Sequence, residues 1–346
     1  MTLREKFLRF ALRLILKLPA GLLVRLSGKP PITIAGRVLD PHMQFISRLG
    51  RSAPPLHKLS VEAARKTVST GMALLAGEAE TSVGSEDSVI KLKDRTLPIR
   101  IYRPFGQDPN IPVMVYFHSG GGVIGDLDSS HEFCALLAYI CKGPVISVDY
   151  RLAPEHPWPA GLEDAIAAYE WALREADTFG APPGQASVGG DSMGANFSAI
   201  IAQEMKLDHK PQPVLQLLIY PATELDSDTP SMRLFGESFP LTTDLLNWFV
   251  GHYLPSGADP EDPRLAPLHS TQMEGLAPAI LVTAGFDMLH DQGLAYSNRL
   301  HDAGVDVVYR SYNALPHGFV SYMGASPAVA KACEDIAILV RDQLRD

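Results

Sequence analysis

Residues 186–200, ASVGGDSMGANFSAI, decide the fold. Residues 186–189 form a short apolar run of the kind found in buried strands, and a helical pattern begins near Ala195. Between them lies GDSMG at residues 190–194, which matches the pattern G-x-S-x-G. A serine on a tight strand-to-helix turn has a strained backbone, and side chains two positions to either side would collide, so the two glycines meet a steric demand. The motif predicts a strand, a sharp turn that presents Ser192, and a helix.

Apolar runs on both sides of this unit extend the same pattern. Each is short, bounded by Gly, Pro or Asp, and typical of a strand buried on both faces; they lie at 113–117, 144–148, 215–219, 279–283 and 305–309. Helix-like segments lie between them, at 161–176, 195–206 and 291–303. Upstream, residues 88–92 and 97–102 flank Asp94-Arg95 and predict two strands joined by a short turn. The alternation predicts an α/β fold with a mostly parallel central sheet flanked by helices.

Composition excludes several classes of protein. The chain has 346 residues, of which 46% are hydrophobic and 20% charged, as in an ordinary globular protein. A net charge of −9 leaves no basic surface to neutralise phosphates, so we expect no nucleic-acid partner. Three cysteines are too few for a disulfide framework and indicate a reducing compartment, the cytoplasm. The sequence has no H-E-x-x-H, no C-x-x-C pair and no P-loop lysine, so we predict neither a metal site nor a cofactor.

The amino terminus is basic and amphipathic. Arg9, Arg13 and Lys17 interrupt the apolar stretch of residues 1–28, so it is predicted to be neither a secretory signal nor a transmembrane span. On a helical wheel the basic residues of segment 1–18 other than Arg4 share one sector, and leucine, isoleucine and phenylalanine side chains cover the other. We expect the apolar face to pack on the rest of the protein or on a second subunit in a homodimer. Peripheral contact with a membrane surface is the alternative.

Three residues form a candidate catalytic triad. A serine hydroxyl is a weak nucleophile at neutral pH, so Ser192 needs a histidine base that a carboxylate holds in the right tautomer. His317 lies in a loop after the last predicted strand and is the natural base. Asp287 follows the strand at 279–283 and is the candidate acid; Asp291 is the reserve. A helix N-cap is the structural alternative for Asp287.

A glycine-rich loop after the strand at 113–117 supplies backbone donors. Acyl transfer needs N–H groups that stabilise a developing oxyanion, and we assign Gly120, Gly121 and the N–H of Met193 to this role. The same loop gives the main rival hypothesis. Residues 120–125 also match G-x-G-x-x-G, and Asp149 ends the next predicted strand, as in a dinucleotide-binding oxidoreductase. That hypothesis leaves Ser192 and His317 without a role.

These residues resemble the bacterial hormone-sensitive-lipase-like carboxylesterases of the α/β-hydrolase fold, over roughly residues 85–345. The blocks that carry the resemblance are HSGGG at 118–122 with GDLD at 125–128, DYRLAPEHPWPA at 149–160, GDSMG at 190–194, DMLHDQG at 287–293 and HGF at 317–319. The resemblance implies a cofactor-free serine esterase for short to medium acyl chains. It also implies a helical cap made from residues 1–75 and from an insertion at 222–262 in a catalytic domain of residues 76–346. A non-catalytic receptor for a small ligand is the alternative from another class.

The sequence departs from the family pattern around the glycine-rich loop and the nucleophile. Ser119 replaces a glycine, Gly122 replaces an aromatic residue, and Met193 replaces an alanine. No catalytic group is lost, so the departures bear on substrate preference. We place Gly122 and Asp191 in the substrate pocket. The space beside Gly122 is expected either to be filled by another side chain, with Met193 as the candidate, or to stay open to substrate.

Overall fold

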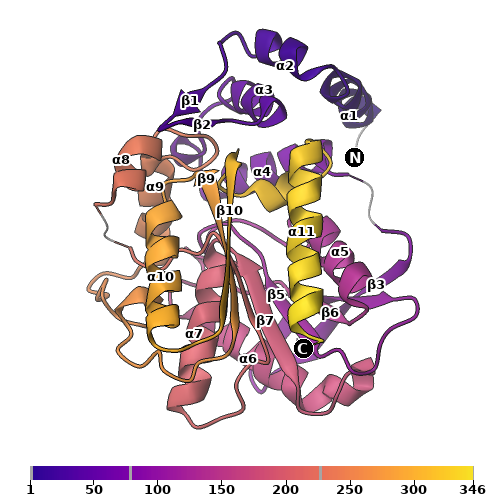
Figure 1. The fold of residues 1–346 in the computed structure, drawn as a ribbon, viewed down its shortest axis with the longest axis vertical. Coiled ribbons are helices and arrows are strands. Elements are labelled where there is room, and N and C mark those ends of the chain that lie inside the picture. Colours follow the sequence, from indigo (N-terminus) through magenta and orange to yellow (C-terminus); the bar gives the residue numbers. More distant parts are fainter. Residues whose placement is uncertain (1–2, 78–79, 226–227, 346) are drawn as a thin grey trace.

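The computed structural model describes residues 3–77, 80–225 and 228–345. The remaining residues of the expected cap, 1–2 and 226–227, lie outside the described ranges. The central sheet contains β3 (Val83–Lys91), β4 (Thr96–Pro104), β5 (Val113–Phe117), β6 (Val145–Val148), β7 (Ala186–Asp191), β8 (Gln216–Ile219), β9 (Ala279–Phe286) and β10 (Val307–Pro316). Their order is β10-β9-β8-β7-β5-β6-β4-β3 (Figure 1). The six strands from β10 to β6 are parallel, which confirms the predicted mostly parallel sheet.

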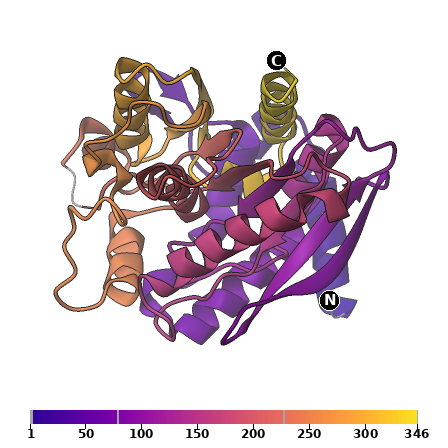
Figure 2. The same ribbon diagram turned by 90° about the horizontal axis from the view of Figure 1, so that it is seen from below.

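The strands follow from the local sequence. Every residue of β5, β6, β7 and β8 is buried, as expected for continuous apolar runs covered on both faces. The predicted pair of upstream strands is also present. Strands β3 and β4 pair antiparallel around the turn at 92–95, which the bond from Leu92 N–H to the Arg95 carbonyl closes at 2.9 Å. Figure 2 shows this hairpin at one edge of the molecule.

Helices cover both faces of the sheet. The helices that follow the strands are α5 (His131–Cys141), α6 (Ala160–Glu175), α7 (Met193–Leu207), α10 (His290–Asp302) and α11 (Pro327–Gln343). Neighbouring residues of a strand point to opposite faces. Tyr116 of β5 contacts Phe133 of α5, and Phe117 contacts Phe197 of α7, so α5 and α7 lie on opposite faces. The sheet is therefore the middle of three layers, as predicted.

The first 75 residues are mostly helical, as predicted. They form α1 (Leu3–Leu16), α2 (Ala20–Leu26), α3 (Pro41–Gly50), the 3₁₀ turn η1 (Leu56–Lys58) and α4 (Val61–Leu75). A short antiparallel pair, β1 (Thr33–Ile34) and β2 (Arg37–Val38), was not predicted. Arg37 donates to the Gly285 carbonyl at 2.7 Å, and the Asp40 N–H donates to the Ala314 carbonyl at 2.9 Å. These bonds hold the segment near the carboxyl ends of β9 and β10, at the top of Figure 1.

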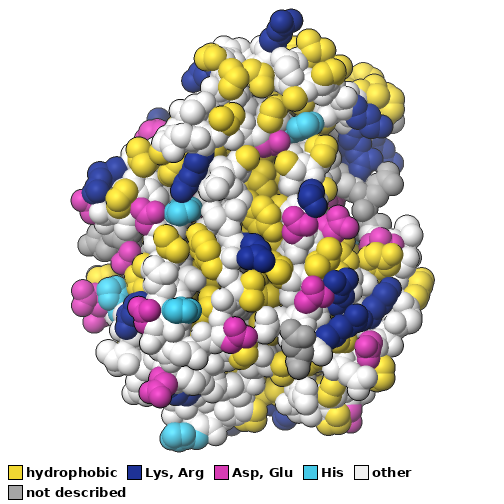
Figure 3. All heavy atoms as spheres, viewed as in Figure 1, with side chains coloured by type: hydrophobic (Ala, Val, Ile, Leu, Met, Phe, Trp, Pro, Cys, Tyr) yellow, Lys and Arg dark blue, Asp and Glu magenta, His cyan; other side chains and the backbone are white. Residues whose placement is uncertain are grey.

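The apolar face of segment 1–18 packs on the protein only in part: Ile15 and Leu18 contact the core, as expected, but the earlier turns of α1 do not follow this expectation. Arg9 and Arg13 point inward and donate to the Ala76 and Gly77 carbonyls, just after α4 ends, at 2.9–3.1 Å. Carbonyl groups at a helix end attract cations, which explains why the basic face turns inward. Phe7, Phe10 and Leu14 are 68%, 62% and 52% exposed. Figure 3 shows hydrophobic and basic side chains side by side over this part of the molecule.

Between β8 and β9 the chain forms α8 (Pro230–Phe235), α9 (Thr243–Tyr253) and the 3₁₀ turn η3 (Pro267–His269). Helix α9 packs against η1 of the N-terminal segment. The two regions that the sequence assigned to a cap are thus in contact. Within the described ranges, every helix is too short or too polar to cross a membrane.

Candidate active site

The predicted strand–turn–helix unit is present at Ser192. Strand β7 ends at Asp191 and α7 begins at Met193, so Ser192 occupies the turn, with φ 55° and ψ −113°. This backbone conformation is strained for a residue with a side chain. A Cβ atom on Gly194 would lie 1.9 Å from the Phe117 carbonyl oxygen. The glycine of the motif therefore lets the turn pack directly against the end of β5.

The structure brings together the three residues of the candidate triad. His317 Nε2 lies 2.9 Å from Ser192 Oγ, and His317 Nδ1 lies 2.8 Å from Asp287 Oδ2. Because the carboxylate can only accept, Nδ1 carries the proton and Nε2 is free to accept from the serine hydroxyl. Asp287 Oδ1 also accepts from the Leu289 N–H at 2.8 Å, so the carboxylate caps the next turn as well as orienting the imidazole. All three residues are buried.

Asp291, the reserve acid, has other partners. Its carboxylate contacts His290 Nδ1 at 3.0 Å and accepts from the Ser231 N–H at 2.8 Å. Burial alone would raise the pKa of Asp291, but these hydrogen bonds together outweigh it and lower the pKa. Asp291 therefore stabilises the contact between α10 and α8. Of the two candidate acids, only Asp287 is hydrogen-bonded to His317.

The glycine-rich loop has the conformation that free backbone donors require. Gly120, Gly121 and Gly122 all have positive φ, at 123°, 61° and 70°. In the part of the chain that the structure describes, the N–H groups of Gly120 and Gly121 donate no hydrogen bond. Met193 is the first residue of α7, where N–H groups have no acceptor within the helix. The three assigned donors are thus available for an oxyanion.

The space beside Gly122 is filled, but by a side chain that the sequence did not indicate. A Cβ atom on Gly122 would lie 2.5 Å from Cδ2 of Tyr253, and one on Gly121 would lie 2.5 Å from Cγ of Phe249. Both rings come from α9. The expectation that Met193 fills this space is therefore wrong, because the ring of Tyr253 already occupies it.

Asp191 does not line a substrate pocket, contrary to our expectation. Its carboxylate is buried and accepts from the hydroxyls of Tyr116 at 3.0 Å and Tyr220 at 3.1 Å. Burial raises the pKa of Asp191, while hydrogen bonds from Ser119, Tyr116 and Tyr220 oppose this shift. The Tyr220 ring lies 4.8 Å from the His317 ring, centroid to centroid. Asp191 therefore supports the site from within the core.

Sequence reasoning missed both of these tyrosines. The available signal was a tyrosine in or after a fully buried strand, because a buried hydroxyl needs a hydrogen-bond partner. Tyr116 lies in β5, and Tyr220 directly follows β8. Asp191 at the end of β7 was the candidate partner for both.

The loop at 120–125 is not a dinucleotide-binding turn. In such a turn the glycines open a helix whose N-terminus binds the pyrophosphate. Here α5 begins only at His131, well after Gly125. A Cβ on Gly125 would lie 2.3 Å from Nδ1 of His118, so this glycine serves close packing inside the loop. The oxidoreductase hypothesis is therefore wrong.

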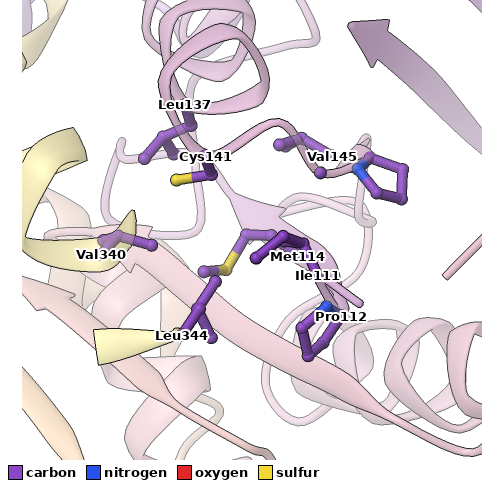
Figure 4. Close-up of a pocket in the computed structure, with 10 residues that line it drawn as sticks. Ile111, Pro112, Met114, Leu137, Cys141, Val145, Val340 and Leu344 are labelled. Atoms are coloured by element: carbon purple, nitrogen blue, oxygen red, sulfur yellow. The ribbon is translucent and has the colours of Figure 1, made fainter. Parts of the chain in front are cut away.

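Two cavities in the described part of the chain lie away from the triad. One, between β5, α5 and α11 (Figure 4), has about 10 Å³ of free space, roughly what a single water needs. The other is an open hollow of about 390 Å³ next to α8, lined by Met232, Arg233, Leu234, Gly236, Glu237 and Thr243. The three triad residues are each less than a tenth exposed.

Comparisons with known proteins agree with this geometry. A family described as having the alpha/beta hydrolase fold matches residues 114–321. The carboxylic ester hydrolase LipN of Mycobacterium tuberculosis (strain ATCC 25618 / H37Rv) is 38% identical, over 92% of this chain and 87% of its own length. The ethyl acetate hydrolase of Pseudomonas putida is 36% identical, over 87% of this chain and 96% of its own. The crystal structure of a serine-to-alanine mutant of LAE6, an alpha/beta hydrolase from the metagenome of Lake Arreo, Spain, has a TM-score of 0.85 at 33% identity, covering 89% of this chain and 99% of that one.

The chain belongs to the α/β-hydrolase family. Within that family it is a hormone-sensitive-lipase-like carboxylesterase, as its resemblance to LipN and to the carboxylesterase NlhH of the same organism shows. The hypothesis of a non-catalytic receptor is accordingly not supported.

Proposed function

We propose that Ser192, His317 and Asp287 hydrolyse carboxylic esters through an acyl-enzyme. The observation that carries this proposal is the continuous hydrogen-bond chain from Ser192 Oγ through the imidazole to the Asp287 carboxylate. Ser192 Oγ attacks the ester carbonyl while His317 Nε2 takes its proton. The negative oxygen of the tetrahedral intermediate accepts hydrogen bonds from the N–H groups of Gly120, Gly121 and Met193.

The second half of the reaction restores the enzyme. His317 returns the proton to the alkoxide oxygen, the ester C–O bond breaks, and the alcohol leaves an acyl group on Ser192. Water then attacks the acyl carbon and gives its proton to His317. The carboxylic acid leaves, and its departure returns the proton to Ser192 Oγ. Asp287 stays ionised and stabilises the imidazolium in both halves. These steps consume one water molecule and use no cofactor.

The expected substrates are small esters of short to medium acyl chains. The name of the ethyl acetate hydrolase, which matches 87% of this chain, supports the short end of this range. The burial of Ser192 and His317 supports a confined site. We also propose that the N-terminal segment up to residue 75 and the insertion at 222–262 act together as a cap over a catalytic domain that spans 76–346. The contact between η1 and α9 supports this division.

The triad is tested with nitrophenyl esters of two to sixteen carbons, before and after treatment with a phosphonylating reagent. Ser192→Ala should lose a factor of about 10⁴ or more in turnover, and so should His317→Ala. Matched controls are Ser52→Ala and His301→Ala, since both side chains are exposed. More than a tenth of wild-type turnover in Ser192→Ala would show that another residue is the nucleophile.

We further propose that α1 and α2 contact an anionic membrane surface in the cytoplasm. The exposed basic side chains described within residues 1–29 are those of Lys6, Lys17, Arg25 and Lys29, whereas the whole chain has a net charge of −9. Exposed apolar rings beside basic side chains suit an anionic lipid surface. The three cysteines are buried and free, which fits a reducing compartment.

Vesicle flotation tests this contact. Full-length protein should float with vesicles rich in phosphatidylglycerol and less with phosphatidylcholine vesicles. Phe7→Glu with Phe10→Glu should abolish flotation, whereas Phe105→Glu, at an equally exposed ring elsewhere, should not. Absence of flotation, together with a dimer that the paired substitution dissociates, would assign the surface to a second subunit instead.

A further inference from the structure

Two rings of α9 cover the loop that holds the assigned oxyanion donors. Phe249 lies against the Cα of Gly121, and Tyr253 lies against the Cα of Gly122. Both side chains are buried, with 8% and 5% of their surface exposed. The helix that carries them begins more than a hundred residues after the loop, so the contact is formed only in the folded chain.

The loop itself cannot carry a ring at this position. Gly122 has a φ of 70°, which L-residues adopt only with strain, and its Cα faces the Tyr253 ring without room for a Cβ. The bulk beside the donors must therefore come from another segment. Tyr253 supplies it from a helical position, where the backbone places no such restriction on the side chain.

Backbone hydrogen bonds tie the residue that carries the ring and the glycine-rich loop to the same segment of the chain. The Tyr253 carbonyl accepts from the Trp158 N–H at 2.9 Å, and the Gly122 carbonyl accepts from the Ala153 N–H at 2.8 Å. Trp158 Nε1 in turn donates to the Arg264 carbonyl at 3.3 Å. Because the stretch 153–158 contacts both partners, the Tyr253 ring has a fixed position relative to the oxyanion loop. The ring is thus fixed next to the loop that holds the assigned donors, where it would limit the size of groups on a carbonyl bound to those donors.

We propose that Tyr253 is a specificity-determining residue, a wall of the ester site that α9 supplies in place of a side chain at position 122. The inference rests on the proposed triad, because it assumes that the ester carbonyl lies next to Gly120 and Gly121. Phe249 is a positioning residue that keeps the loop in place beneath it. Removing the Tyr253 ring should open space for longer or branched groups without removing any group that takes part in the chemistry.

The test is Tyr253→Ala, with kcat/KM measured on two ester series. One varies the acyl chain from acetate to octanoate with a fixed nitrophenol, and the other varies the alcohol with a fixed acetyl group. Each methylene newly buried is worth roughly a four-fold change. The ratio of kcat/KM on the bulkiest ester to kcat/KM on the smallest should therefore rise at least ten-fold in one of the two series.

Controls separate this role from a structural one. Tyr253→Phe keeps the ring and should leave both ratios within about two-fold. Tyr139→Ala removes a partly exposed tyrosine on α5 and should change nothing. If Tyr253→Ala does not fold, Tyr253→Leu keeps part of the volume and should shift the ratio in the same direction. Unchanged ratios, or an equal loss on every ester, would overturn the proposal while leaving the triad intact; activity that survives Ser192→Ala would instead overturn the proposed function.

Discussion

Replacing Asp191 by alanine tests how far the site depends on its buried carboxylate. The substitution leaves the hydroxyls of Tyr116 and Tyr220 in the core without their acceptor. An unsatisfied buried donor costs about 1–3 kcal/mol, so two of them cost about 2–6 kcal/mol, against a total stability of about 5–15 kcal/mol for a typical protein. Relief of the buried charge offsets part of this cost. We expect a net loss of about 2–4 kcal/mol in the free energy of unfolding.

The same substitution should also lower activity, although the Asp191 side chain takes no part in the proposed reaction. Tyr220 accepts from the Val320 N–H at 3.3 Å, and its ring lies beside His317. Losing Asp191 frees this tyrosine to shift, so kcat on an acetate ester should fall while KM changes little. Urea unfolding and steady-state kinetics measure the two effects. Asp128→Ala, which removes an exposed partner of Arg100, is the control and should cost less than about 1 kcal/mol.

Adding Tyr116→Phe and Tyr220→Phe to Asp191→Ala gives a sharper test. The triple variant has no orphaned tyrosine hydroxyl but leaves the Val320 N–H without its acceptor, so it should be more stable than the single variant by about 1–3 kcal/mol. A single variant within 1 kcal/mol of wild type, or a triple variant less stable than the single one, would refute the reasoning.

Three further outcomes follow from the same geometry. Gly194→Ala would bring a Cβ within 1.9 Å of the Phe117 carbonyl oxygen. The ester assay should therefore show the loss of most of the activity, and thermal unfolding should show a loss of several kcal/mol in the free energy of unfolding. Gly251→Ala, at a helical position with nothing within 4 Å, should instead stabilise the protein by about 0.5–1 kcal/mol in the same assay. Because burial raises the pKa of Asp191, the folded protein retains this proton to a higher pH than the unfolded chain, whose pKa is about 3.9. Stability from this group is present below that value and lost as pH rises through the folded pKa, so wild type should lose stability relative to Asp191→Asn as pH rises above about 4. A difference that stays constant with pH would contradict this.

The sequence predicted those parts of the fold and site that depend on local pattern. The central strands are continuous apolar runs, and Ser192, Asp287 and His317 each follow such a run at a turn, so chain order was enough to pair them. The small hairpin at 33–38 was missed because two-residue strands have no periodicity to detect. A helical wheel shows which side chains of α1 share a face but not which face the protein covers. That choice depends on carbonyl groups at 76–77, far away in the sequence.

The placement of Tyr253 on a helix also has an evolutionary consequence. In this chain the positive φ at Gly122 and the Tyr253 ring against it leave no room for a side chain, although the family pattern has an aromatic residue there. Position 253 is the last residue of a helix, where the backbone does not require glycine. Substrate range can therefore diverge by single substitutions in the insertion while the reaction machinery is inherited unchanged. Homologues with identical catalytic loops can thus differ in the esters they accept.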